Sequence, residues 1–521
     1  MKDLWCSYYT NSKDITSYMV SKLDIEENDV ILEPSAGEGV FIDEILDLQK
    51  KIHIDALDIN KEAIKVLKLK YENNKSVVVR ETDTLLDEQL DSYTLSQLWL
   101  KNSDTLFDQQ LDLFSDKGGH YTKVIGNPPY GAWQDYKKRE LLKKKFEGHY
   151  VKETYTLFLL RCISVLRMQG KLSFIIPDTY LFLNMHSKLR EILLLNTKIN
   201  EILIFPSNFF PGISFGYSNL SIITLERCSK DDALNNRFKV KKGFKSPNEF
   251  AKTNSKELNE IKEYEFVQKD ILANDLCRFI LADDKIRKLI LKTQQKLGNV
   301  ADIVTGFYTG DNLKYIKVKN KNIKGSKQYS VIDKEMIVDC TSIYGSKNKE
   351  EAYIPYIKSA PKRKYSKPID EWFVRWDEKT VEFYNNNTKS RFQNASYYFK
   401  SGIGIPMVKS NTIRAFYMND RLFDQSIVGI FPKDPSKLLY ILALMNSTIV
   451  NELIHIINPT ANNSANYVKQ IPYIEPNDKT EMNSISNMVK SLLEYENSGN
   501  FEEADALQTK IDSMIEKVYL Q

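Results

Sequence analysis

The sequence has no long hydrophobic run. Its longest run of apolar residues is eight, from Leu438 to Met445, whereas a helix that crosses a bilayer needs about 20. The N-terminus, MKDLWCSYYTNSKD, also lacks the charged-then-apolar pattern of a secretory signal. These absences predict a protein that stays in the cytoplasm and does not span a membrane.

Cysteine is scarce as well. The 521 residues include five cysteines, which are scattered and form no Cys-x-x-Cys pair. This predicts neither a disulfide framework nor a cysteine zinc site, and we expect no metal. Glycine (20) and proline (16) are few, while tyrosine (29) and phenylalanine (25) are frequent. Fibrous and disordered classes are therefore excluded, and the length predicts two or three globular domains.

The net charge of +4 is unevenly distributed along the chain. Residues 1–230 contain 29 Lys and Arg against 32 Asp and Glu, so their net charge is −3. Residues 231–521 carry +7, and residues 301–421 alone carry +9. An acidic first part and a basic second part suit a protein in which one part performs chemistry and the other contacts a polyanion.

Short apolar runs alternate with helical segments over residues 1–230. This βαβ pattern predicts an α/β fold with a doubly wound, mainly parallel sheet of seven strands. The expected strands are 29–33, 52–57, 76–79, 122–126, 171–176, 200–204 and 220–225. Ligands of such sheets bind at the carboxyl ends of the strands.

The rest of the chain differs from this pattern. Residues 85–120 interrupt it with acidic and amphipathic sequence, and we interpret them as an insertion. Residues 231–300 are highly charged and predict a connector. Residues 301–521 contain short β-prone runs separated by Gly and Pro, and helical sequence from about residue 479, which together predict an α+β domain.

The segment Glu33-Pro-Ser-Ala-Gly-Glu-Gly39 follows the first predicted strand. Its glycines allow a sharp turn against a ligand. Asp58 ends the second strand, where a carboxylate can accept both hydroxyls of a ribose. The loop lacks the third glycine of the dinucleotide fingerprint, so a nucleoside without phosphates fits better than a dinucleotide.

The strongest motif is Asn127-Pro128-Pro129-Tyr130, after the fourth predicted strand. It could simply end a strand, because proline fixes φ and removes a donor. However, the Asn127 side-chain oxygen and the Pro128 carbonyl also form two acceptors on a stiff frame, which suits an exocyclic amino group. Tyr130 could stack on the ring that carries this group.

With these motifs, the sequence resembles the gamma-class, TaqI-like adenine-N6 DNA methyltransferases of type II restriction-modification systems. The resemblance implies a Rossmann-like class I methyltransferase domain over residues 1–230, with S-adenosyl-L-methionine as cofactor. Tyr8-Tyr9-Thr10 resembles the family segment that closes over the methionine end. The resemblance implies cofactor contacts for Thr10, Glu33, Pro34, Ser35, Ala36, Gly37, Gly39, Asp58, Ile59, Asp83 and Phe158.

The resemblance also implies the reaction. The catalytic set is Asn127, Pro128, Pro129 and Tyr130, which would bind the amino group of an adenine flipped out of double-stranded DNA while its nitrogen attacks the sulfonium methyl. Tyr130 and Phe210 would stack on the flipped base, although Phe210 could instead be a core residue. Cytosine C5 chemistry is excluded because no Pro-Cys pair provides its nucleophile.

Residues 301–521 resemble, more faintly, the target-recognition regions of these enzymes. Basic and aromatic residues alternate there, a composition suited to phosphates and base edges. Candidate DNA contacts are Lys137, Lys138, Arg139, Lys362, Arg363, Lys364, Arg375 and Arg391. The resemblance further implies a monomer on DNA and a separate cognate restriction endonuclease from which methylation would protect host DNA.

Other functions remain open at this stage. Asn-Pro-Pro-Tyr also serves methylation of RNA and of protein glutamine. A combined restriction enzyme and methylase is a further alternative, although we expect no nuclease before the first cofactor motif and find no convincing nuclease motif behind it. The last alternative is a catalytically inactive DNA-binding protein on the same scaffold.

Overall fold

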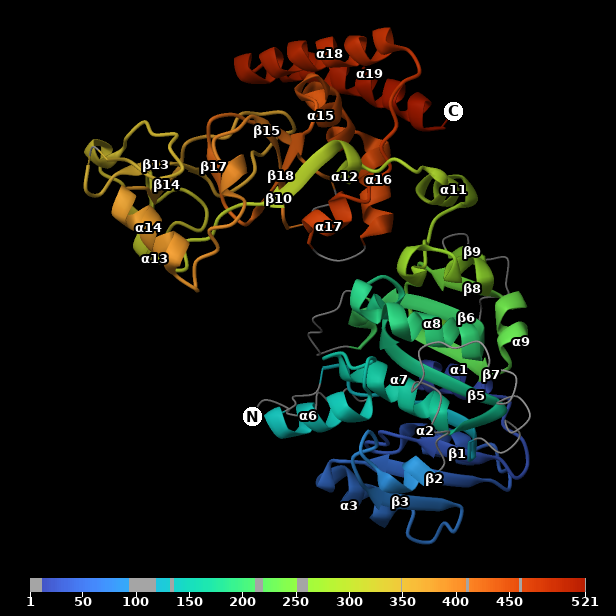
Figure 1. The fold of residues 1–521 in the computed structure, drawn as a ribbon. Coiled ribbons are helices and arrows are strands. Elements are labelled where there is room, and N and C mark those ends of the chain that lie inside the picture. Colours follow the sequence, from blue (N-terminus) through green and yellow to red (C-terminus); the bar gives the residue numbers. More distant parts are fainter. Residues whose placement is uncertain are drawn as a thin grey trace, which may run out of the picture. The chain divides into compact units, whose positions relative to one another are not determined.

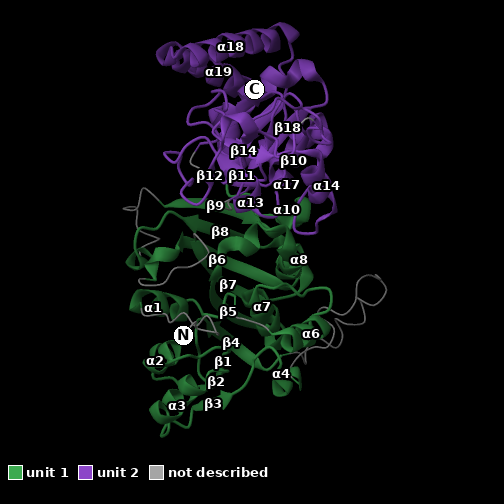
Figure 2. Ribbon diagram, turned by 90° about the vertical axis from the view of Figure 1, so that its left-hand side faces the viewer, with its two compact units in different colours: residues 1–281 green, residues 282–521 purple. Residues whose placement is uncertain are grey.

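The computed structural model describes residues 12–92, 119–131, 135–210, 219–250, 261–347, 349–408, 412–458 and 462–520. The chain forms two compact units, unit 1 over Met1–Leu281 and unit 2 over Ala282–Gln521 (Figure 2). Each unit is described by itself.

Unit 1 is built on a nine-stranded sheet in the order β3-β2-β1-β4-β5-β7-β6-β8-β9 (Figure 1). Strands β3, β2, β1, β4 and β5 pair in parallel, whereas β7 is antiparallel to both of its neighbours. The strands are β1 (Val30–Glu33), β2 (His53–Asp58), β3 (Val77–Glu81), β4 (Tyr121–Gly126), β5 (Leu166–Pro177), β6 (Thr197–Pro206), β7 (Asn219–Arg227), β8 (Arg237–Lys242) and β9 (Lys262–Val267).

Helices cover both faces of this sheet. Figure 2 shows α1, α2 and α3 on one face and α7 and α8 on the other. The α-helices described in unit 1 are α1 (Lys13–Ser21), α2 (Val40–Leu46), α3 (Lys61–Lys70), α4 (Glu88–Ser92), α6 (Tyr136–Lys145), α7 (Thr154–Val165), α8 (Ser187–Asn196), α9 (Lys230–Asn235) and α10 (Gln268–Leu272).

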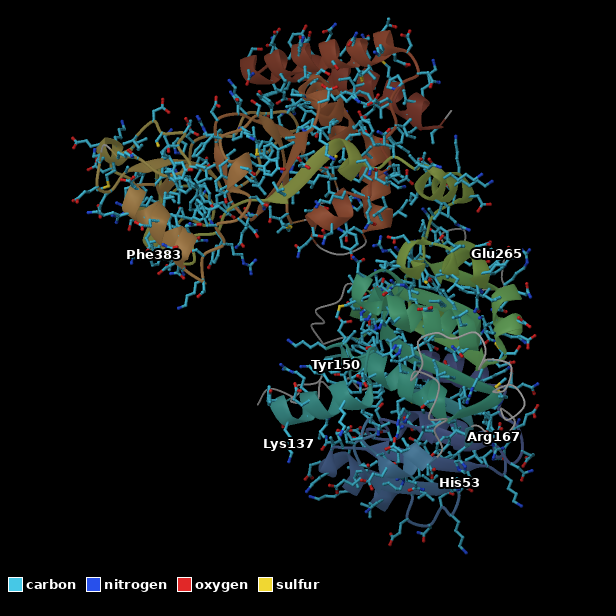
Figure 3. All side chains as sticks on the ribbon, in the orientation of Figure 1. His53, Lys137, Tyr150, Arg167, Glu265 and Phe383 are labelled. Atoms are coloured by element: carbon cyan, nitrogen blue, oxygen red, sulfur yellow. The ribbon has the colours of Figure 1, made fainter. Side chains whose placement is uncertain are left out.

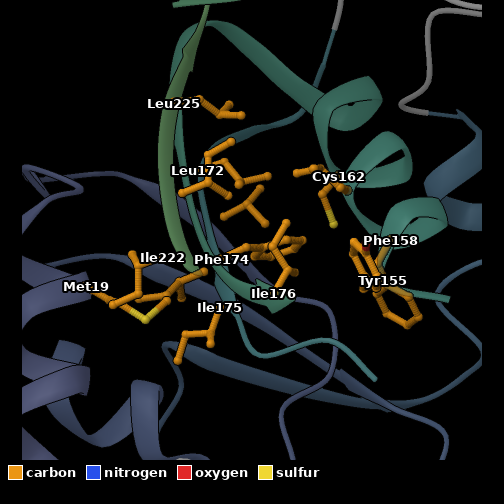
Figure 4. Packing of buried hydrophobic residues seen from close by; sticks show 14 of the residues in the cluster. Met19, Tyr155, Phe158, Cys162, Leu172, Phe174, Ile175, Ile176, Ile222 and Leu225 are labelled. Carbon is orange, nitrogen blue, oxygen red and sulfur yellow. The ribbon is translucent and has the colours of Figure 1, made fainter. Parts of the chain in front are cut away.

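The core of unit 1 explains why its central strands read as continuous apolar runs. Phe174, Ile175 and Ile176 of β5 are fully buried, because helices cover both faces of a central parallel strand. Figure 4 shows Phe174 and Ile176 on the side of α7, and Ile175 with Met19 of α1 on the opposite side. Both faces of β5 therefore need apolar side chains.

The structure confirms an α/β sheet and contains all seven predicted strands, but the sheet has nine strands and not seven. The two additional strands, β8 and β9, lie in the segment 231–300 that was predicted to be a connector. They extend one edge of the sheet through β6, and unit 1 continues to Leu281. Of the predicted insertion 85–120, residues 93–118 lie outside the described residues.

Unit 2 has mixed α and β content. It contains a four-stranded sheet, β10-β18-β15-β16, and a five-stranded sheet, β12-β11-β14-β13-β17. The strands are β10 (Ala301–Thr305), β11 (Ile316–Val318), β12 (Ser330–Val331), β13 (Tyr353–Ile357), β14 (Trp372–Arg375), β15 (Gly402–Pro406), β16 (Phe416–Met418), β17 (Leu422–Phe423) and β18 (Ile427–Pro432).

The unit ends in long helices, at the position where the sequence predicts them. Its α-helices are α11 (Asp284–Lys292), α12 (Leu297–Val300), α13 (Asn312–Tyr315), α14 (Glu378–Asn386), α15 (Leu438–Asn446), α16 (Thr448–Ile457), α17 (Ala465–Val468), α18 (Lys479–Ser498) and α19 (Phe501–Leu520). In the described ranges no single helix has the length and apolar character of a membrane span, although α15 and α16, bent by 73°, reach that composition when taken together.

Candidate active site

The candidate site lies where the strand order of unit 1 reverses. From β1 the chain proceeds outward to β2 and β3, whereas β4 pairs on the other side of β1. Such a switch point leaves a crevice at the carboxyl ends of the two central strands. The loop 34–39 leaves β1 at this place, and the loop 127–130 leaves β4 beside it. The fold thus brings together the two strongest motifs of the sequence.

The loop after β1 requires its glycines. Gly37 and Gly39 have positive φ of 52° and 79°, a conformation that suits glycine. A Cβ on Gly39 would lie 2.6 Å from Tyr71 Oη and 2.9 Å from Leu67 Cδ2. The Tyr71 hydroxyl itself lies 3.0 Å from the Gly39 carbonyl oxygen. The loop therefore packs directly against the end of α3 and has no room for a side chain at residue 39.

Asp58, at the end of β2, holds this loop from the other side. Its Oδ2 accepts a hydrogen bond from the Gly37 N–H (2.8 Å), and its Oδ1 accepts one from the Asn60 N–H (2.7 Å). Burial raises the pKa of Asp58, although these backbone donors and the Ile59 N–H act in the opposite direction. A carboxylate has about four acceptor sites, so beside these donors Asp58 can still accept a ribose hydroxyl.

Glu33, the last residue of β1, is buried with 1% of its surface exposed. Its Oε2 has no hydrogen-bond partner among the described residues. Burial, together with the charges of Asp58 and Asp43, raises the pKa of Glu33 well above its usual range. A buried carboxyl oxygen without a partner favours a cationic ligand group that would compensate the charge of the carboxylate.

Asp83 follows β3 and contacts the helix after the Asn-Pro-Pro-Tyr motif. Its Oδ2 lies 2.6 Å from Lys138 Nζ of α6, and each of the two side chains is 21% exposed. The next residue, Thr84, donates a hydrogen bond from its hydroxyl to the Pro34 carbonyl (2.6 Å). The loop after β3 is thus tied both to the loop after β1 and to α6.

The Asn-Pro-Pro-Tyr motif also contacts the loop after β1. Ser35 Oγ donates a hydrogen bond to the Asn127 carbonyl oxygen (3.3 Å). A Cβ on Gly126 would lie 3.4 Å from Pro34 Cδ, so the two loops are in close contact. Within the motif, the Tyr130 hydroxyl donates to Asn127 Oδ1 (2.8 Å). Asn127 therefore already acts as an acceptor, the role predicted for it toward an amino group.

The predicted aromatic contacts are less accessible than the sequence suggests. Tyr130 is 1% exposed and Phe210 is 4% exposed, so neither ring offers an open stacking surface in this state. Phe158 on α7 is buried at 6%. The Tyr130 ring packs edge-on against Tyr155, which like Phe158 is on α7, with ring centroids 6.5 Å apart. Thr10 lies outside the described residues.

The predicted DNA contacts fall into two groups. Lys137, which Figure 3 shows on the outside of α6, Lys362 and Arg391 are exposed. The others are partly buried. Lys364 Nζ donates to the Asn446 carbonyl (2.7 Å), and Arg375 Nε donates to Asp377 Oδ2 (2.7 Å). Burial lowers the pKa of Lys364. These bonds indicate structural roles within unit 2.

Arg363 is the clearest case of such a structural role. Its guanidinium lies 2.8 Å from Glu496 Oε1 and 2.6 Å from Asp505 Oδ1, on α18 and α19 respectively. It also lies over the Phe501 ring, 4.4 Å from the centroid. The Glu496 side chain is only 3% exposed. Arg363 thus fixes the two C-terminal helices to the segment before β14. Arg139 on α6 remains a candidate that is partly buried.

Sequence reasoning missed two polar residues near the site. Arg161 is the single charged residue of α7 and is 2% exposed. Asp178, directly after β5, is 7% exposed and accepts a hydrogen bond from Asn219 Nδ2 (3.1 Å). Both stand out as charged residues within apolar sequence, and charged side chains are rarely buried without a specific partner. That signal could have identified them.

Comparisons with known proteins identify similar methyltransferases. Residues 53–210 match the family model described as Eco57I restriction-modification methylase. The type II methyltransferase M.HincII of Haemophilus influenzae is 26% identical over 209 residues, which are 38% of this chain and 34% of that protein. The type II restriction enzyme and methyltransferase RM.Eco57I of Escherichia coli is 25% identical over 216 residues, 39% of this chain and 20% of that protein. The aligned part thus spans about a third or less of these relatives.

A solved structure resembles the fold of nearly the whole chain. It is a nuclease-deletion mutant of the Type ISP restriction-modification enzyme LlaGI in complex with a DNA substrate mimic. The match covers 94% of this chain and 47% of that chain, with a TM-score of 0.55 and 12% sequence identity. At this identity the likeness concerns the fold alone. By its family match and its relatives, unit 1 of the present chain contains an Eco57I-type restriction-modification methylase domain.

Proposed function

We propose that the protein transfers a methyl group from S-adenosyl-L-methionine to the N6 amino group of adenine in double-stranded DNA. The observation that carries the proposal is the contact between the two motif loops at the switch point of the sheet. Ser35 Oγ bonds to the Asn127 carbonyl (3.3 Å), so a nucleoside on the loop after β1 would lie beside the acceptors of the Asn-Pro-Pro-Tyr motif.

The residues present fit this cofactor. Asp58 has acceptor capacity for ribose hydroxyls, and Asp83 has a carboxylate for the amino group of the cofactor's adenine. Glu33, whose Oε2 lacks a partner in the described residues, would face the cationic part of the molecule. Pro34, Ser35, Ala36, Gly37, Gly39, Ile59, Phe158 and Thr10 complete the proposed set.

S-adenosyl-L-methionine would supply a methyl group on a positively charged sulfur. Asn127 Oδ1 and the Pro128 carbonyl would accept the two N–H groups of the target amino group and draw its nitrogen toward tetrahedral geometry. Acceptors placed where positive charge develops stabilise the transition state, and orientation supplies much of the rate. Pro128 and Pro129 stiffen this frame because each fixes φ.

The target base must leave the duplex to reach these acceptors. Tyr130 and Phe210 would then stack on it, which requires both buried rings to shift from their present positions. The Tyr130 hydroxyl now donates to one lone pair of Asn127 Oδ1. For the target amino group to use that lone pair, the hydroxyl must turn away. These movements would couple base entry to the release of the acceptor.

We further propose that unit 2 recognises the DNA target. Its net positive charge over residues 301–421 suits contacts with phosphates, which dominate the affinity of DNA-binding proteins. Lys362 and Arg391 of unit 2, with Lys137 of unit 1, are the exposed candidates. Methylation would protect host DNA from a cognate restriction endonuclease, and the enzyme would act as a monomer on DNA.

The test is to incubate the purified chain with labelled S-adenosyl-L-methionine and bacterial DNA that lacks adenine methylation. Mass spectrometry of the digested nucleosides should identify N6-methyladenosine. Asn127→Ala should lower kcat at least about 100-fold, the scale of losing one transition-state hydrogen bond, and leave the affinity for S-adenosylhomocysteine unchanged. Tyr130→Phe should retain most activity, whereas Tyr130→Ala should lose more because stacking is worth about 1–3 kcal/mol.

Parallel incubations separate the alternatives. Label in RNA or in a glutamine-containing peptide, with none in DNA, would replace the DNA proposal by methylation of those substrates. Cofactor binding without label in any substrate would indicate a DNA-binding protein on a methylase scaffold. Absence of cofactor binding would contradict the proposal as a whole.

A further inference from the structure

Helix α7 contains one charged residue, Arg161, in otherwise uncharged sequence, Thr-Tyr-Thr-Leu-Phe-Leu-Leu-Arg-Cys-Ile-Ser-Val. All residues of this helix are buried, and Arg161 is 2% exposed. Burying a guanidinium is costly unless acceptors surround it. The position of those acceptors therefore indicates what the arginine does.

Three acceptors of the Arg161 guanidinium belong to the segment that follows β3. Arg161 Nε donates to the Thr84 carbonyl (3.3 Å), and its Nη2 donates to the Asp87 carbonyl (2.7 Å). Its Nη1 lies 2.7 Å from Asp91 Oδ1. One planar guanidinium thus binds three points between Thr84 and Asp91 of α4, the kind of fixed geometry for which arginine is suited.

The same turn is tightened from inside. Asp87 Oδ2 accepts hydrogen bonds from Thr82 Oγ1 (2.7 Å) and Arg80 Nη1 (3.0 Å), and its Oδ1 accepts one from the Leu90 N–H (2.8 Å). Burial alone would raise the pKa of Asp87, but these donors and the Arg80 charge lower it below its usual value. The segment 82–91 is therefore held together by its own hydrogen bonds and can be positioned as one piece.

This segment includes Asp83, which is proposed to bind the adenine of the cofactor. Asp83 lies next to Thr84, and the Thr84 hydroxyl bonds to the Pro34 carbonyl of the loop after β1 (2.6 Å). Phe158, the other proposed adenine contact, precedes Arg161 by one turn on α7, and residues at this spacing share a helix face. Arg161 thus links the segment that carries Asp83 to the helix that carries Phe158.

We propose that Arg161 is the positioning residue for the cofactor's adenine, which it serves by holding Asp83 at a fixed place relative to Phe158. The inference rests on the proposed function, because it concerns the cofactor proposed there. It extends that function to a residue that touches neither the methyl donor nor the target base. The predicted consequence is selectivity for the 6-amino group of the cofactor's purine.

The test compares two ligands by calorimetry, S-adenosylhomocysteine and S-inosylhomocysteine. In the inosine analogue an oxygen replaces the amino group and would face the Asp83 carboxylate. The wild-type protein should bind the adenosine compound at least tenfold more tightly. Arg161→Met should weaken S-adenosylhomocysteine about tenfold or more and bring the ratio of the two affinities close to one.

Arg190→Met is the matched control. Arg190 is also fully buried in unit 1, and it donates to the carbonyls of Leu276, Tyr180 and Leu183, away from the segment after β3. Its loss should lower stability but leave the affinity ratio as in the wild type. If Arg161→Met does not fold, Thr84→Val tests the inference instead. This substitution removes only the hydroxyl that links the same segment to Pro34, and it should also lower the ratio of the two ligand affinities.

The outcomes are distinct. Failure of the wild-type protein to bind S-adenosylhomocysteine would contradict the proposed function. Binding without selectivity between the two ligands would overturn the inference, and so would selectivity that survives in Arg161→Met, or in Thr84→Val should the arginine variant not fold. If the ratio of the two affinities also falls in the Arg190→Met control, loss of any buried arginine is enough to reduce selectivity. This result would overturn the inference as well.

Discussion

Lys138 Nζ lies 2.6 Å from Asp83 Oδ2, so the helix after the Asn-Pro-Pro-Tyr motif places a cation on the acid proposed to bind the cofactor's adenine. The other Asp83 oxygen accepts the Leu85 N–H (3.2 Å). Each Asp83 oxygen therefore already accepts one donor and keeps a second lone pair. We expect the Lys138 ammonium and the adenine amino group to compete for Oδ2, because the ammonium already occupies space beside this oxygen.

This competition predicts that Lys138→Met binds S-adenosylhomocysteine several-fold more tightly than the wild type. The pair is partly exposed, so its loss should cost no more than about 1 kcal/mol of stability. Isothermal calorimetry measures the affinity. Lys137→Met, the exposed neighbour, is the control and should change nothing. Unchanged or weaker binding by Lys138→Met would mean that Asp83 accommodates both groups at once.

The state of Glu33 predicts a proton release. The pKa of this carboxyl is raised in the cofactor-free protein by burial and by neighbouring acids, and a cation placed beside it would lower that pKa. Binding of S-adenosyl-L-methionine should therefore release a proton, and affinity should rise with pH as Glu33 ionises. Calorimetry in buffers of different ionisation enthalpy, between pH 5 and 9, measures the released proton.

Glu33→Gln is the control for this linkage. The substitution keeps the shape of the side chain but cannot ionise, so any proton still released comes from the ligand or from another group of the site, such as Asp58. The variant should fold normally and bind the cofactor more weakly. Equal proton release by both proteins would exclude Glu33 as the source and place the cationic part of the cofactor elsewhere.

Asp178 predicts a pH dependence of stability. Burial raises the pKa of Asp178 to about 6 in the folded protein, although Asn219 and Lys242 act in the opposite direction. Because the folded protein holds this proton more tightly than the unfolded chain does, the contribution favours folding at low pH. It is lost as the pH rises from about 4 through 6, by about 3 kcal/mol at most.

Asp178→Asn should remove this pH-dependent contribution to stability, while its side-chain oxygen still accepts the hydrogen bond from Asn219. The stability of the variant relative to the wild type should therefore increase with pH between 4 and 7 and stay constant above. Thermal unfolding of both proteins across that range gives the difference. A constant difference would show that Asp178 is already ionised in the folded protein at low pH.

Arg363 and Arg391 should behave in opposite ways. Arg363→Met removes the charged partner of the buried Glu496 and should destabilise unit 2 by about 1–3 kcal/mol. This is less than for a fully buried pair, because the arginine is partly exposed. Arg391→Met should leave stability unchanged, weaken DNA binding and lower its salt dependence by about one counterion. Calorimetry measures stability, and DNA titration at several salt concentrations measures binding. Normal stability of Arg363→Met, or unchanged DNA binding of Arg391→Met, would contradict the structural role of Arg363 or the DNA contact of Arg391.

The sequence predicts the central part of unit 1 well and its edge poorly. The second half of β5 has apolar, buried residues on both faces, Phe174, Ile175 and Ile176, so its position was found. Strand β8 reads Arg-Phe-Lys-Val-Lys-Lys, in which Lys and Arg hide the alternation of Phe238 and Val240. β8 lies between β6 and the edge strand β9, and it buries Phe238 and Val240 while Arg237 and Lys239 at alternate positions are exposed. Because such a charged composition also favours helices, this segment was interpreted as a connector.

For the candidate site, local motifs were predictable and long-range pairs were not. Gly39 and Asn127 belong to short patterns whose chemistry follows from the residue types. The ion pair of Lys138 with Asp83 and that of Arg363 with Glu496 join distant parts of the chain, and many lysines and arginines would be equivalent by composition. Which lysine or arginine forms an ion pair with a given acidic residue is determined by the fold.

The contact between Gly126 and Pro34 has a consequence for how such a site can diverge. A methyl group at residue 126 would already touch Pro34 Cδ at 3.4 Å and Phe174 Cε1 at 3.5 Å, so nothing larger than alanine fits while the ring of Pro34 remains. Residues 34 and 126 are therefore expected to co-vary among homologues, with a bulkier residue at one permitted only by a smaller one at the other.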